Sequence, residues 1–197
     1  MSDEVFYRLG LQALSRFGSL DGGRVVMLTS AREGEGKTFV AQRLAAALAG
    51  QCSQPVALVC AGSRGGEATV GWSELLQAPT LHEAMLSPGA AEGLSVMGPG
   101  ARPRVQDLFQ PEAVKAALQA LRQRFALTVI DGPSMSACGA LLRQCDGVMV
   151  VVDASQTRRE VLQGALVGNP VPTDRMMGVV LNRRPQYVPG WFYRRVF

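Results

Sequence analysis

The sequence predicts one α/β domain with a mostly parallel sheet and helices on both of its faces. Short apolar segments suited to buried strands alternate with segments of helical periodicity along the 197 residues. A glycine-rich octapeptide lies between the first such strand and the helix that follows it. Polar residues stand at or just after the ends of later strands, where ligands bind in parallel sheets.

Each expected element rests on a local pattern. The first helix, 3–17, has apolar side chains at helical spacing. Gly22-Gly23 then separates this helix from the first strand. Apolar stretches predict strands at 24–29, 55–60, 94–97, 126–130, 147–152 and 177–181. Further helices are expected at 39–49, 111–123 and 157–167. The spacing of Thr80 and Glu83 is that of a capping box and predicts one more short helix there, after a loop at 61–71.

Residues 31–38 form a motif that we call the phosphate loop. They match the pattern G-x-x-x-x-G-K-[ST], with Ala31 in place of the first glycine. Lys37 is one of only two lysines among 20 basic residues, which argues against a chance match. Gly34 and Gly36 allow the backbone to curl so that its N–H groups face a phosphate at the positive end of the helix. We expect Lys37 to reach the outer phosphates and the Thr38 hydroxyl to hold Mg²⁺.

A second motif completes the expected nucleotide site. Residues 128–133, Thr-Val-Ile-Asp-Gly-Pro, have the form of a Walker B strand that delivers Asp131 to the Mg²⁺. A guanine-specific site would usually show Asn-Lys-x-Asp, whereas this chain has Leu-Asn-Arg-Arg at 181–184. Because an asparagine amide can pair with adenine, Asn182 favours ATP over GTP.

The predicted site therefore has three sets of residues. Lys37 and Asp131 are the expected catalytic residues, and Thr38 and Asp131 are the expected metal ligands. The expected nucleotide-binding residues are Ala31, Arg32, Glu33, Gly34, Glu35, Gly36, Lys37, Thr38, Phe39, Asn182 and Arg183. The expected cofactors are ATP or ADP with Mg²⁺.

Composition limits the other possibilities. No apolar run approaches the roughly 20 residues of a membrane span, and the acidic N-terminus lacks a secretory apolar core, so we expect a cytoplasmic protein. The four cysteines lack C-x-x-C spacing and are expected to be buried thiols. The net charge of +4 resides in the segment 183–197, with four arginines and no acid, and the balanced remainder argues against a nucleic-acid surface.

We call residues 183–197 the basic aromatic tail, within a single nucleotide-binding domain that spans residues 1–197. Four aromatic residues lie between the arginines of the tail, Tyr187, Trp191, Phe192 and Tyr193, and Phe197 is the last residue. Such side chains suit an anionic membrane surface or a membrane protein. The alternative is that the aromatic residues fold back over apolar surface of the domain.

With these motifs in order, the chain resembles the MinD/ParA branch of P-loop ATPases. Within that branch it most resembles the cytoplasmic domain of the bacterial tyrosine kinases of capsule and exopolysaccharide synthesis. The resemblance covers most of residues 4–197, is weakest from 61 to 103, and rests on residues 29–38, 129–133, 145–152, 178–183 and 187–193. MinD and ParA proteins have a lysine early in the loop, where this chain has Arg32. The resemblance implies peripheral association with an inner-membrane polysaccharide co-polymerase or chain-length protein.

Several family features are missing. The two aspartates of the family's Walker A′ motif, which coordinate Mg²⁺ and help to deprotonate tyrosine, align with Cys60 and Gly62. Neither residue is suited to act as the base. Changing both to aspartate is expected to recover some activity if the rest of the site is intact. The family's subunit-contact motif Glu-x-x-Arg-x-x-Arg is reduced to Glu4, Tyr7 and Gly10, so homo-oligomerisation is an open question.

Three functions remain open from the sequence. The first is an ATP-binding, kinase-like regulator of polysaccharide synthesis or export with degraded tyrosine kinase activity. The second is a working autokinase or slow ATPase, whose missing carboxylates come from Glu67 or from a partner. The third is a MinD-like positioning ATPase. Cys60 and Gly62 favour the first over the second, and Arg32 and the tail favour it over the third.

Overall fold

The computed structural model describes residues 3–62 and 70–184 and has a seven-stranded sheet. The strand order is β3-β4-β2-β5-β1-β6-β7. Neighbouring strands are parallel, except that β3 runs antiparallel to β4. The strands are β1 (Arg24–Ser30), β2 (Val56–Cys60), β3 (Leu86–Pro88), β4 (Leu94–Met97), β5 (Leu127–Asp131), β6 (Gly147–Asp153) and β7 (Met176–Asn182).

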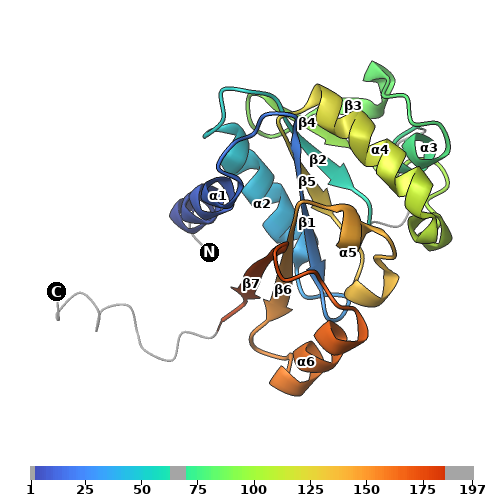
Figure 1. Cartoon of the computed structure of the whole chain (residues 1–197). Helices are drawn as coiled ribbons and strands as arrows, with labels where there is room; N and C mark the ends of the chain where they lie inside the picture. The colour runs from blue at the N-terminus through green and yellow to red at the C-terminus, as the bar shows by residue number, and fades with distance from the viewer. Residues whose placement is uncertain (1–2, 63–69, 185–197) are drawn as a thin grey trace.

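Helices cover both faces of this sheet, as Figure 1 shows. One face carries α1 (Asp3–Phe17) and α2 (Lys37–Ala49). The other face carries α3 (Trp72–Gln77), α4 (Pro111–Arg124), α5 (Leu141–Gln144) and α6 (Arg159–Gly168). Three short 3₁₀ turns are η1 (Glu83–Met85), η2 (Val105–Phe109) and η3 (Met135–Ala137). Among the described helices, none has the length and apolar character needed to cross a membrane.

The central strand β1 shows why the sheet is buried on both sides. Val25 and Met27 pack into the core beneath α4, whereas Val26 and Leu28 pack into the core beneath α1 and α2. All four side chains are fully buried. A strand that is covered on both faces has no polar face, which explains why it appears in the sequence as a continuous apolar run.

The structure confirms the predicted fold class, the predicted strands and the long helices, with small shifts at their ends. The prediction of a helix that starts at Thr80 is wrong. Only the 3₁₀ turn η1 forms there, and Thr80 precedes it. The Glu83 carboxylate does not cap a helix but pairs with Arg124 of α4 at 2.9 Å.

Among the helices and strands, α3, β3 and α5 were not expected from the sequence. Helix α3 begins directly after Gly71, whose N–H donates to the Glu74 carboxylate at 2.7 Å. The helix is held by the burial of Trp72 and Leu75 in the core next to α4. A six-residue helix that depends on tertiary packing has no periodic signal of useful length.

The topology gathers polar residues at one edge of the sheet. Strands β5, β1, β6 and β7 are adjacent and parallel, so their carboxyl ends lie together. Asp153 at the end of β6 is in register with Asn182 at the end of β7. Asp131 ends β5, and the phosphate loop follows β1 directly. The residues that the sequence singles out therefore come from neighbouring strand ends.

Candidate nucleotide site

The phosphate loop turns sharply into the first turn of α2. Gly34 and Gly36 have φ angles of 85° and 89°, which side chains with a Cβ rarely adopt. A Cβ on Gly36 would also collide with the side-chain amide of Asn182 on β7. Gly36 is the N-cap of α2, and the helix starts at Lys37, so the loop leads into the positive end of a helix.

Lys37 is held inside the loop, with only 7% of its side chain exposed. Its ammonium donates to the Ser30 hydroxyl at 2.9 Å and to one carboxylate oxygen of Glu33 at 3.0 Å. The other oxygen of Glu33 accepts from the backbone N–H of Ser134 at 2.9 Å. Ser134 follows the Walker B segment, so Glu33 connects the phosphate loop to the end of β5.

Thr38 and Asp131 form the pair expected for the metal. The Thr38 hydroxyl donates to one carboxylate oxygen of Asp131 at 2.7 Å. The other oxygen, Oδ1, is buried and has no hydrogen-bond partner among the described residues. Burial raises the pKa of Asp131, and the hydrogen bond from Thr38 offsets only part of this effect. A buried carboxylate oxygen without a partner, next to a hydroxyl, fits a hard cation such as Mg²⁺.

We expect Asp131→Asn to remove the effect of Mg²⁺ on nucleotide affinity, because an amide is a much poorer ligand for Mg²⁺ than a carboxylate. The ligand-free variant should melt no lower than the unmodified protein, since the native carboxylate carries an uncompensated desolvation cost. Titrations of ADP with and without Mg²⁺, together with melting curves, measure both effects. A Mg²⁺ dependence that survives in the variant would remove Asp131 from the metal site.

Glu35 ties the loop to the ends of β6 and β7. Its side chain is 2% exposed and accepts from the backbone N–H of Arg32 at 2.8 Å and from the hydroxyl of Thr157. Its backbone carbonyl accepts from the amide of Asn182 at 3.0 Å. The Glu35 side chain therefore fixes the phosphate loop to the end of β6, and its carboxylate points into the protein instead of toward solvent.

Arg183 adds a second tie between the loop and the sheet. Its guanidinium donates to the carbonyl of Gly34 at 3.1 Å and to the carboxylate of Asp153 at 2.8 Å. Hydrogen bonds from Ser155 and Arg183 lower the pKa of Asp153 to about 2, so this carboxylate is ionised at neutral pH. The ion pair joins the end of β6 to the residue that follows β7, and both to the loop.

The structure brings the predicted site residues to one edge of the sheet, but the side chains of Phe39 and Asn182 are engaged in contacts with other parts of the protein. The ring of Phe39 packs edge to face on Phe6 of α1, with centroids 5.9 Å apart, and beside Arg43. The amide of Asn182 contacts the phosphate loop, and its oxygen accepts from the N–H of Arg183 at 3.0 Å. Recognition of adenine by Asn182 stays a prediction.

Three residues of this site were missed from the sequence. Ser30, Ser134 and Thr157 each donate to, or accept from, a charged side chain of the loop. The sequence gives no strong signal for Ser134 and Thr157, because each lies in a separate loop far from the motif along the chain. Ser30 directly precedes the motif, and its position at the end of β1 is the one signal that could have identified it.

Cys60 and Gly62 lie where the missing acidic pair was expected. Cys60 ends β2 and is in register with Asp131 on the neighbouring strand. Burial, followed by the nearby charge of Asp131, raises the pKa of the Cys60 thiol to about 11. The thiol is therefore protonated at neutral pH and cannot accept a proton as a base.

The structure corrects the expectation that both acids can simply be restored. A Cβ on Gly62 would lie 2.6 Å from the backbone carbon and oxygen of Gly132, and 2.7 Å from the nitrogen of Pro133. The N–H of Gly62 also donates to the carbonyl of Asp131 at 2.8 Å, which keeps the two segments together. An aspartate at position 62 thus requires the backbone to move.

Two of the sequence hypotheses concern residues that the structure does not describe. Glu67, considered as a substitute carboxylate, lies outside the described residues, as do positions 185–197 of the basic aromatic tail.

At the N-terminus, Glu4 pairs with Arg8 at 2.6 Å on the exposed side of α1. Tyr7 is half exposed, and Gly10 is buried against the side chain of Gln51.

Comparison with known proteins adds structural relatives. No protein-family model matches the chain, and no curated protein sequence matches it. Among solved structures, the VpsO kinase domain is 28% identical, with 81% of this chain and 84% of that one covered and a TM-score of 0.70. The BceF tyrosine kinase domain is 24% identical, with 93% and 78% covered and a TM-score of 0.74.

The kinase domain of the Escherichia coli tyrosine kinase ETK has the same architecture. It is 20% identical, with 86% of this chain and 72% of that chain covered and a TM-score of 0.71. The chain has the fold of a bacterial tyrosine kinase domain. In this fold, the described site contains the phosphate loop and Asp131. Cys60 ends the neighbouring strand β2, and Gly62 lies two residues beyond that strand end.

More distant structural neighbours share this fold. They include a Cyanothece McdA variant in complex with ATP, 19% identical with a TM-score of 0.59. They also include a cobyrinic acid a,c-diamide synthase from Mycobacterium smegmatis with bound ADP and magnesium, 20% identical with a TM-score of 0.56. The fold shared with these proteins is the P-loop fold of the MinD/ParA type.

Proposed function

We propose that this protein binds ATP or ADP with Mg²⁺ through the phosphate loop, Asp131 and Asn182. The observation that carries the proposal is the geometry around Lys37 and Thr38. A nearly buried ammonium lies at the start of α2, and the Thr38 hydroxyl contacts the carboxylate of Asp131, whose other oxygen is buried and has no hydrogen-bond partner in the part of the chain that the structure describes. Lys37 would contact the outer phosphates, and Thr38 with Asp131 would hold Mg²⁺, which neutralises phosphate charge when it is bound.

We propose further that tyrosine kinase activity is degraded. A kinase of this kind needs a carboxylate to accept the proton of the attacking hydroxyl. Cys60 offers a thiol whose pKa is raised to about 11, and Gly62 offers no side chain and no room for one. The nucleotide half of the site is thus better supported than the half that would activate a tyrosine.

The biological role that we propose is regulation of exopolysaccharide or capsule synthesis or export. It rests on the structural likeness to the tyrosine kinase domains and on the sequence resemblance described above. The corresponding partner is an inner-membrane polysaccharide co-polymerase or chain-length protein. We propose a cytoplasmic location with peripheral contact to the membrane through the basic aromatic tail.

One experiment separates this proposal from a working autokinase or ATPase. Pure protein is incubated with ATP and Mg²⁺, and both phosphotyrosine and released phosphate are measured over time. We expect ATP to bind, with phosphotyrosine no higher than in a Lys37→Ala control. Phosphotyrosine above that control would favour the autokinase, and steady release of phosphate without phosphotyrosine would favour a working ATPase, either the slow ATPase or the positioning ATPase.

Removal of the tail tests its proposed contact with the membrane. A chain that ends at Arg184 loses two of the four arginines and all of the tail's aromatic side chains. We expect it to melt at the temperature of the full chain but no longer to sediment with vesicles of anionic lipid, because each arginine near such a surface contributes about 1 kcal/mol. Neutral vesicles are the control. Earlier melting with sedimentation retained would show that the tail covers the domain instead.

A further inference from the structure

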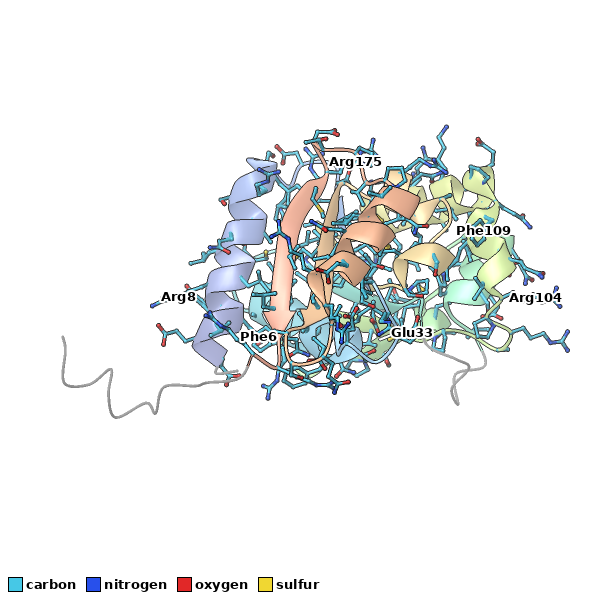
Figure 2. The ribbon with its side chains drawn as sticks, turned by 90° about the horizontal axis from the view of Figure 1, so that it is seen from below. Phe6, Arg8, Glu33, Arg104, Phe109 and Arg175 are labelled. Carbon is cyan, nitrogen blue, oxygen red and sulfur yellow. The ribbon has the colours of Figure 1, made fainter. Side chains whose placement is uncertain are left out.

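The phosphate loop contains an acidic side chain that faces its own lysine. Glu33 is the third residue of the loop, and its carboxylate accepts from Lys37 at 3.0 Å and from the N–H of Ser134 at 2.9 Å. In the view of Figure 2, Glu33 lies between Phe6 of α1 and Arg104. About 69% of the Glu33 side chain is exposed, so it can leave this position without disturbing the core.

The two donors that hold Glu33 are of the kind that phosphate uses. One is the ammonium of the loop lysine, and the other is a backbone N–H that follows the Walker B aspartate. Because both bind one carboxylate, they converge on a space the size of a small anion. Charged hydrogen bonds of this type are about twice as strong as neutral ones.

The charges around Glu33 agree with this geometry. Burial raises the pKa of Glu33, but the hydrogen bonds from Lys37 and Ser134 outweigh it and leave the pKa below its ordinary value. The carboxylate is therefore ionised at neutral pH. Its charge also acts on Asp131, whose pKa it helps to raise. A phosphate that binds beside Lys37 would therefore be repelled by the carboxylate of Glu33 as well as by that of Asp131.

We propose that Glu33 is a built-in competitor for the phosphate position, which the outer phosphate of a nucleotide must displace from Lys37 and Ser134. This inference rests on the proposed nucleotide binding. It assigns to Glu33 an effect on affinity opposite to that expected for the rest of the loop: its carboxylate weakens nucleotide binding, and selectively so for ligands with an outer phosphate.

The test compares Glu33→Gln with the unmodified protein. The Glu33 carboxylate repels an incoming phosphate and competes with it for Lys37 and Ser134, so loss of its charge should tighten ADP binding roughly tenfold. AMP, which lacks the outer phosphates, should bind both proteins within about twofold. The ligand-free variant should melt slightly lower, because it loses the ion pair with Lys37. Affinity and ligand-free stability thus change in opposite directions, which a purely structural role for Glu33 would not produce.

Glu83→Gln is the matched control. Glu83 is also an exposed glutamate in an ion pair, at 2.9 Å from Arg124 of α4. Its substitution should leave ADP affinity unchanged. Titrations with and without Mg²⁺ complete the test, because weaker Mg²⁺–ADP binding by Glu33→Gln would make Glu33 a contributor to the metal site and overturn the inference. Equal ADP affinity in both proteins would also overturn it, whereas no binding by either overturns the proposed function itself.

Discussion

Lys37→Ala should abolish the thermal stabilisation that ATP or ADP gives to the unmodified protein. A ligand at 100 times its dissociation constant stabilises the native state by about 2.7 kcal/mol. For a chain of this size, that raises the melting temperature by roughly 5–10 °C. The variant loses the ammonium that is positioned to contact the outer phosphates, so its melting curve should be the same with and without nucleotide.

The variant should remain folded, which makes the result interpretable. Ser30 still donates to the carbonyl of Arg32, and Glu33 keeps its hydrogen bond from Ser134. Alanine is also the better helix former at this position. Lys115→Ala is the natural control, because Lys115 is the only other lysine of the chain and lies exposed on α4. Lys115→Ala should keep the shift, and an unchanged shift in Lys37→Ala would refute the assignment.

The second large effect concerns tyrosine autophosphorylation. We expect it to be absent, and we expect that restoring the two missing aspartates does not bring it back. The double variant Cys60→Asp with Gly62→Asp should show no phosphotyrosine and should be less stable than the unmodified protein. The reason is steric, since a Cβ at position 62 meets the backbone of Gly132 at 2.6 Å. Forcing extra atoms into a packed site costs about 1–3 kcal/mol, which chemical denaturation can measure.

Two single variants separate the causes. Gly62→Ala adds only the Cβ, so it should account for most of the lost stability. Cys60→Asp adds a carboxylate in register with Asp131 and tests the cost of a second charge there. Full stability in Gly62→Ala would show that the backbone adjusts easily. Phosphotyrosine above background on the unmodified protein would contradict the proposed loss of activity directly.

The sequence was most informative where a residue pattern determines local geometry. The motif at residues 31–38 correctly predicted a strand, a glycine turn and a helix, because Gly34 and Gly36 adopt backbone angles that other residues avoid. Asp131 was placed correctly at the end of a buried strand. Continuous apolar runs, as in β1 and β6, predicted a sheet covered on both faces, since such strands have no polar side to expose.

Local patterns were misleading where tertiary packing decides. The spacing of Thr80 and Glu83 suggested a helix start, yet Glu83 pairs with Arg124, which lies 41 residues away along the chain. Helix α3 depends on the burial of Trp72 in a core made by distant segments. Short elements of this kind gain their stability from contacts that sequence spacing does not record.

For the candidate site, the sequence by itself determined that the motif residues meet. The tertiary structure decided which further residues join them and what the side chains do there. The strand order brings Lys37, Asp131 and Asn182 to one edge of the sheet, as the alternation of strands and helices implied. Only the folded chain shows that Glu33 occupies the donors of Lys37 and Ser134, because the two donors are 97 positions apart in the sequence. Likewise, only backbone proximity between Gly62 and Gly132 shows that the missing acid has no room. Hydrogen bonds and close contacts between distant segments depend on distances that a one-dimensional pattern does not contain.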